Sequence, residues 1–133
     1  MDYKNIKFRA WHKEQNKMFE VLVLDMNSGE VFLDGFTVET QYKGQTQQET
    51  VWVSVDEVEL MMYTGQQDKH GKDIYDGDIV KSFNVVDTVY WNDDYACFSG
   101  ADSGGDDIDF NVEAEYTRHR EIIGNKYENP ELV

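Results

Sequence analysis

Cysteine, proline and basic residues are all scarce in this sequence. The one cysteine, Cys97, cannot form an internal disulfide, so a disulfide-stabilised extracellular fold is excluded and a reducing cytoplasm is expected. Twelve Lys and Arg stand against 27 Asp and Glu, and the net charge of -15 opposes direct binding to nucleic acid or to an anionic membrane. No apolar run approaches the ~18 residues of a membrane span, and the first residues lack the apolar stretch of a secretory signal. We therefore expect a soluble, cytoplasmic protein.

Several signatures of known chemistry are also missing. The chain has no GxGxxG or Walker A stretch, no GxSxG and no HExxH. The three histidines, His12, His70 and His119, lie in separate polar segments without partners at metal-ligand spacing, which predicts surface positions. No cofactor is predicted.

The chain does contain enough apolar material for a folded core. Of 133 residues, 40% are apolar and 18 are Phe, Trp or Tyr, which is too many for a disordered chain of this charge. The length predicts one domain, with room for two small lobes.

Short stretches alternate apolar and polar residues with period two, which is the pattern of half-buried strands. They are Ile6–Trp11, Met18–Leu24, Val31–Val38, Thr50–Val55, Ile79–Val80, Val85–Val86 and Val89–Trp91. Residues 42–49 are polar and predict a surface loop or hairpin tip, and Gly124–Asn125 is predicted to end a strand-like stretch that starts at Glu115. The pattern predicts a mainly β protein.

One segment allows two interpretations. In residues 57–63, Val58, Leu60 and Met62 fall on one face if the segment is extended, which favours a strand. A helix over Asp56–Tyr63 is the alternative, because Asp56 could cap it and Glu, Leu and Met are good helix formers. Glycines beside turn signals, at Gly65, Gly71, Gly77 and Gly124, are predicted to serve backbone geometry.

Three stretches of the sequence form a recognisable set: Ile6–Trp11 followed by Lys17-Met18, then Leu60–Gly65 continuing through Asp68–Val80, and Ile122–Leu132. Together they resemble the YopX family of phage and prophage proteins. The resemblance implies one domain over residues 1–133, with an N-terminal β-hairpin lobe (1–62) and an SH3-like barrel with a C-terminal tail (63–133). It implies no catalytic residues, because the family has no established enzymatic activity.

Four aromatic residues near the middle of the second half are candidates for a binding surface: Trp91, Tyr95, Tyr90 and Phe98. SH3-like barrels bind ligands through exposed aromatic side chains. Strand alternation places Tyr90 and Trp91 on opposite faces, so part of the set belongs to the core. For Trp91 core packing is the favoured interpretation, and for Tyr95 core packing and a binding surface are about equally supported.

Acidic residues suggest two further sites, each with a plainer alternative. Asp102, Asp106 and Glu113 fall at positions 1, 5 and 12 of a calcium-loop count, but the glycine required at position 6 is absent, so a solvated acidic loop is favoured. Asp76 and Asp78 flank Gly77 and would be the first suspects in an unrecognised enzyme, although acids around a turn usually cap backbone amides.

The favoured function is a non-enzymatic phage or prophage accessory protein that acts through protein–protein contacts, with self-association expected and a host protein as another partner. A basic N-terminal patch opposes the acidic second half and offers a route to association; it consists of Lys4, Lys7, Arg9, Lys13 and Lys17. The alternative is an acidic nucleic-acid mimic that inhibits a host DNA-binding protein.

Overall fold

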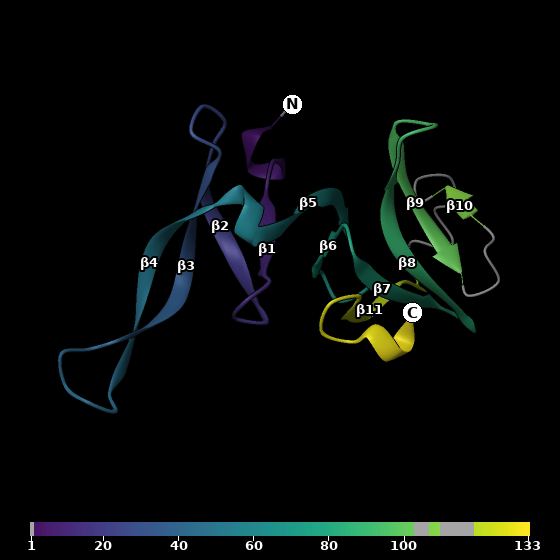
Figure 1. The fold of residues 1–133 in the computed structure, drawn as a ribbon. Helices are drawn as coiled ribbons and strands as arrows, with labels where there is room; N and C mark the ends of the chain where they lie inside the picture. The colour runs from purple at the N-terminus through teal and green to yellow at the C-terminus, as the bar shows by residue number, and fades with distance from the viewer. Residues whose placement is uncertain (1, 103–106, 110–118) are drawn as a thin grey trace. The chain divides into compact units, whose positions relative to one another are not determined.

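The computed structural model describes residues 2–102, 107–109 and 119–133. The chain divides into two compact units: an N-terminal unit of Lys7–Met61, and a C-terminal unit that begins at Met62 and includes the described residues before Lys7. Strands dominate both units (Figure 1), so the expected mainly β class is confirmed. Within the described ranges, no helix is long and apolar enough to cross a membrane.

The sheet of the N-terminal unit has the strand order β4-β3-β2-β1-β5. Its strands are β1 (Phe8–His12), β2 (Lys17–Asp25), β3 (Glu30–Glu39), β4 (Thr46–Ser54) and the first residues of β5 (Val58–Gln67). In the turn between β2 and β3, Asp25 Oδ1 accepts hydrogen bonds from the backbone N of Asn27 (2.9 Å) and Ser28 (3.2 Å). Such side-chain bonds to the backbone fix a tight turn, which sets the antiparallel pairing of the two strands.

A β-bulge in β2 determines which of its side chains reach the core. The pairing with β3 shifts between Val21 and Val23, so Leu22 is the extra residue. Strict alternation would put Val21 and Leu24 on opposite faces, but the bulge resets the alternation and both pack on the core. The buried residues of this core are Ala10, Phe19, Val31, Leu33 and Val58.

A second bulge does the same in β3. The pairing with β4 shifts between Leu33 and Phe36, and Gly35 lies within the shift with φ of +85°. Glycine adopts this left-handed conformation without the Cβ penalty of other residues. Phe36 therefore packs on the same core as Leu33.

The C-terminal unit contains the end of β5, which pairs with β6 (Asp73–Tyr75), and a sheet of order β10-β9-β8-β7-β11. The strands of this sheet are β7 (Asp78–Ser82), β8 (Val85–Asn92), β9 (Cys97–Asp102), β10 (Asp107–Asp109) and β11 (Glu121–Asn125). The buried core of the C-terminal unit consists of Ile74, Val80, Val89 and Phe98, and Ile122 packs against it. The 3-10 helices are η1 (Tyr3–Asn5), η2 (Val55–Glu57) and η3 (Pro130–Leu132).

Several sequence predictions can be compared with these elements. Val58–Gln67 is a strand and only Val55–Glu57 is helical, so the strand was the correct interpretation of this segment. The polar loop was placed too long, because β4 already begins at Thr46. In the described residues β10 and β11 end the sheet, so the closed barrel implied by the resemblance is not observed there.

The expected surface position of His12 is wrong. His12 is 4% exposed, because it lies on the core face of β1 and its ring meets the rings of Phe19 and Phe36 edge-on. Its Nδ1 accepts a hydrogen bond from the backbone N of Gln15 (3.1 Å), which satisfies this buried ring nitrogen. His12 is thus part of the core of the N-terminal unit.

The structural role predicted for the glycines is confirmed. Gly65, Gly71 and Gly77 have φ between +79° and +86°. Gly124 serves another purpose: it does not end the strand but lies inside β11, beside a register shift that starts at Ile122. A Cβ at Gly124 would lie 2.5 Å from Asn129 Oδ1, so the close approach of Asn129 requires glycine here.

We predict that Gly124→Ala destabilises the protein by about 1 to 3 kcal/mol, because the new methyl group displaces Asn129, whose Oδ1 accepts a hydrogen bond from Asn125 N (3.2 Å). The urea midpoint measures the change. In an Asn129→Gly background the clash is absent, so Gly124→Ala should then cost much less. An equal cost in both backgrounds would show that Asn129 is not the cause.

Candidate functional site

The predicted aromatic residues lie on the β8–β9 hairpin, where the strand register separates them. Trp91 pairs directly with Phe98 and therefore shares its face, and the two rings meet edge-on at 5.1 Å between centroids. Phe98 is buried in the core, whereas Trp91 is 46% exposed. The hairpin thus holds a half-exposed indole against a fixed phenyl ring.

Tyr90 lies on the other face, as alternation predicted. It pairs with Ser99 across the hairpin, and its hydroxyl oxygen accepts a hydrogen bond from Asn92 Nδ2 (3.4 Å). Asn92 is buried, and its Oδ1 accepts a hydrogen bond from the backbone N of Asp94 (3.0 Å) in the turn. Tyr90 therefore supports the end of the hairpin rather than extending the face of Trp91.

Tyr95 lies in the turn itself. It is 78% exposed, and the next residue, Ala96, has a positive φ of 50° that lets the chain reverse. Cys97, at the start of β9, is half-buried. The hairpin end therefore presents two exposed aromatic side chains, Trp91 and Tyr95, close in sequence on a turn fixed by Asn92.

The predicted acidic sites differ in outcome. Asp78 is buried and its Oδ2 accepts a hydrogen bond from the backbone N of Tyr75 (2.8 Å), which is the capping role expected for it. For the calcium hypothesis, Asp102 ends β9, while Asp106 and Glu113 lie outside the described residues. Among the residues that the structure does describe, no group of three or more metal-ligating side chains is found.

A polar cluster that sequence analysis missed is built around Asp68, which is 6% exposed. Its Oδ1 accepts hydrogen bonds from the backbone N of His70 (2.8 Å) and Lys72 (2.9 Å). Its Oδ2 accepts one from the backbone N of Ile122 in β11 (3.2 Å). One buried carboxylate therefore ties the loop after β5 to a strand far along the chain.

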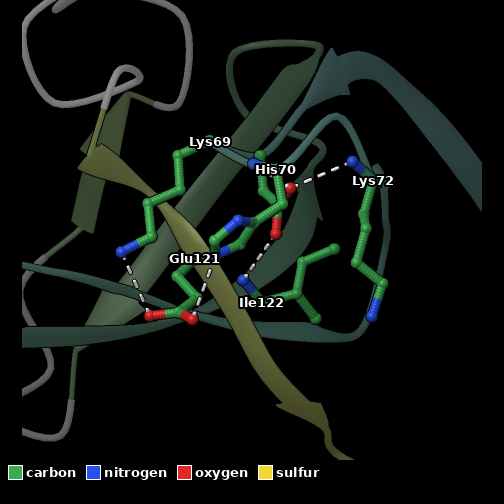
Figure 2. A network of polar contacts seen from close by, with 6 residues as sticks. Lys69, His70, Lys72, Glu121 and Ile122 are labelled. Carbon is green, nitrogen blue, oxygen red and sulfur yellow. Dashed lines mark hydrogen bonds and ion pairs between the residues drawn. The ribbon is translucent and has the colours of Figure 1, made fainter.

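The same loop reaches β11 through side chains at the surface. Lys69 Nζ and His70 Nε2 lie 3.4 and 3.3 Å from the two carboxylate oxygens of Glu121. Figure 2 shows both side chains converging on Glu121. Lys69, His70 and Glu121 are all well exposed, so each of these contacts contributes little to the stability of the fold.

The environment shifts the pKa of both carboxylates downward. Burial raises the pKa of Asp68, but the amides of Lys72, Ile122 and His70 outweigh it and leave the pKa below the ordinary value. The hydrogen bonds from His70 and Lys69 lower the pKa of Glu121. Both groups are therefore held as anions.

The cluster contains Asp, His, Lys and Glu, which are residue types common in active sites. Their contacts here hold the loop after β5 against β11. Both oxygens of Asp68 accept hydrogen bonds from backbone amides, which gives the carboxylate a role in holding the loop to β11. Nearby Arg120 is buried and its Nη1 donates to Gln66 Oε1 (3.2 Å), while burial lowers its pKa against the opposing effect of Asp87. The Asp-Lys-His-Gly turn signal was visible in the sequence, but its partner strand was not.

Comparison with known proteins identifies the family. The model of the YopX protein family matches residues 7–133. The chain belongs to the YopX family. The crystal structure of protein EF1440 from Enterococcus faecalis is similar to this YopX-family chain, with a TM-score of 0.62, 24% identity and 96% of each chain covered. That similarity concerns the fold alone. No curated protein matches the chain.

We predict that Asp68→Asn destabilises the protein by about 1 to 3 kcal/mol at neutral pH. The asparagine side chain has an NH2 group in place of one carboxylate oxygen, and this donor would face backbone N–H groups that need an acceptor. The lowered pKa means that the carboxylate stabilises the fold above about pH 4 and that this contribution is lost as pH falls through the folded-state pKa. Urea unfolding across this pH range measures both effects.

The variant should therefore show a flatter loss of stability in acid than the wild type. Glu121→Gln is the matched control, since it removes an exposed carboxylate from the same cluster and should cost less. Identical acid profiles for Asp68→Asn and the wild type would contradict the role of Asp68.

Proposed function

We propose that this YopX-family chain is a non-enzymatic accessory protein of a phage or prophage that acts in the host cytoplasm through protein–protein contacts. The observation that supports this proposal best is the half-exposed Trp91, whose ring is held against the buried Phe98 at the end of a fixed hairpin. A large aromatic side chain in a fixed position loses little conformational entropy on binding, and Trp and Tyr are enriched among the residues that dominate protein interfaces.

The partner is a host protein or a second copy of the chain. Tyr95 adds a second aromatic side chain, and neighbouring Asp93 and Asp94 give the hairpin turn a negative charge. The acidic nucleic-acid mimic is the alternative, and the two differ in what drives binding. A mimic binds through charge and weakens steeply with salt, whereas an aromatic contact is far less sensitive to salt.

We predict that Trp91→Ser and Tyr95→Ser each weaken partner capture by the tagged full-length chain about tenfold, because each removes an aromatic anchor. Quantitative affinity purification from bacterial lysate over a salt series measures this. Tyr42→Ser is the matched control, since Tyr42 is also exposed but lies in the N-terminal unit.

Sedimentation velocity on the purified chain separates self-association from capture of a host protein. The proposal fails if all variants retain the same proteins, or if nothing is retained above background and the chain is a strict monomer. Capture that disappears at high salt and does not depend on Trp91 would favour the acidic mimic.

A further inference from the structure

The sheet of the N-terminal unit has an apolar row on the face opposite its core. Val23, Phe32 and Trp52 pair with one another across β2, β3 and β4. The rings of Phe32 and Trp52 are stacked, with 5.0 Å between centroids and 15° between planes. Trp52 is 49% exposed and Val23 is 44% exposed. Three apolar side chains thus form a continuous, partly open strip.

Nothing in the hydrophobic core requires this row. The neighbours of Phe32 in the chain, Val31 and Leu33, are completely buried, so the core lies on the other side of β3. Val23 is turned away from the core by the same bulge that turns Val21 and Leu24 toward it. Exposed tryptophan in such a strip is unfavourable in water unless another surface covers it.

Carboxylates frame the row on both sides. Glu20 pairs with Asp34, and Asp25 pairs with Glu30, in the flanking positions of β2 and β3 on the same face. Arg9, in β1, pairs with Glu20 and brings a basic residue to this surface. The acidic-rimmed face, defined as Val23, Phe32, Trp52 and these four carboxylates, therefore has an apolar centre and a mainly negative border.

We infer that the acidic-rimmed face docks a partner protein whose own surface has an apolar centre flanked by Lys or Arg. The apolar centre supplies affinity, and the rim selects a partner of opposite charge. A second copy is disfavoured as the occupant, because its carboxylates would face those of the first in a chain of net charge -15. This inference shares with the proposed function only the idea of protein contact, since Trp91 lies in the other unit.

The test uses a short peptide of alternating Lys and Phe as the probe and the full-length, 15N-labelled chain as the receptor. The peptide should bind saturably, with amide and indole shifts concentrated on Val23, Phe32 and Trp52. Two matched peptides separate the contributions: one with Glu in place of Lys, and one with Ser in place of Phe. Both should bind at least tenfold more weakly.

Variants of the chain complete the test. Trp52→Ser should weaken binding about tenfold. Val23→Ser should weaken it by a smaller factor, and this second variant keeps the test informative if Trp52→Ser perturbs the sheet. Glu30→Gln with Asp34→Asn should weaken binding and flatten its salt dependence. Trp91→Ser is the control and should bind like the wild type, so failure here is distinct from failure of the proposed function.

Three results would overturn the inference. One is equal binding of the Glu–Phe and Lys–Phe peptides. Another is a set of shifts that lies elsewhere on the chain. The third is loss of self-association in Trp52→Ser, which would make this face a contact between copies.

Discussion

The N-terminal unit has one sheet whose two faces must be divided between core and surface, and two β-bulges make that division. With strict alternation, Leu24 would lie opposite to Val21 and Phe36 opposite to Leu33. The bulges at Leu22 and around Gly35 bring all four toward the core. The shift in β2 also leaves Val23 on the other face, beside Phe32, which regular alternation with Val31 and Leu33 places there. The bulge in β2 therefore contributes both to the core and to the acidic-rimmed face.

The C-terminal unit depends on a polar interaction in a comparable way. The Asp68 carboxylate accepts hydrogen bonds from backbone amides of its own loop and of β11. In β11 the donor is Ile122, which lies 54 residues after Asp68 in the sequence. Without it, these amides would lose their partner at a buried position, which costs more than a hydrogen bond normally contributes. The carboxylate therefore acts within the fold, by holding the loop after β5 against β11.

Local patterns in the sequence predicted what local forces decide. Alternation gave the strands and the opposite faces of Tyr90 and Trp91, and the turn at Gly77 gave the capping role of Asp78. The misplaced features depend on residues distant in the chain. His12 is buried because Phe36 covers it, and Asp68 is important because β11 lies beside it. The place of Val23 in the exposed row was missed because a bulge leaves no clear mark on periodicity.

The basic residues of the N-terminal unit bear on which partners are possible. Lys13 Nζ lies 3.4 Å from Glu59 and donates to the carbonyl oxygen of Asp56. Lys17 donates to the carbonyl oxygen of Gly35 and lies over the Phe19 ring. Both cations thus have partners within their own unit, in exposed contacts that contribute little individually. A partner protein with its own Lys or Arg residues would be attracted by the acidic-rimmed face whatever these two lysines contact, which is the basis of the docking inferred above.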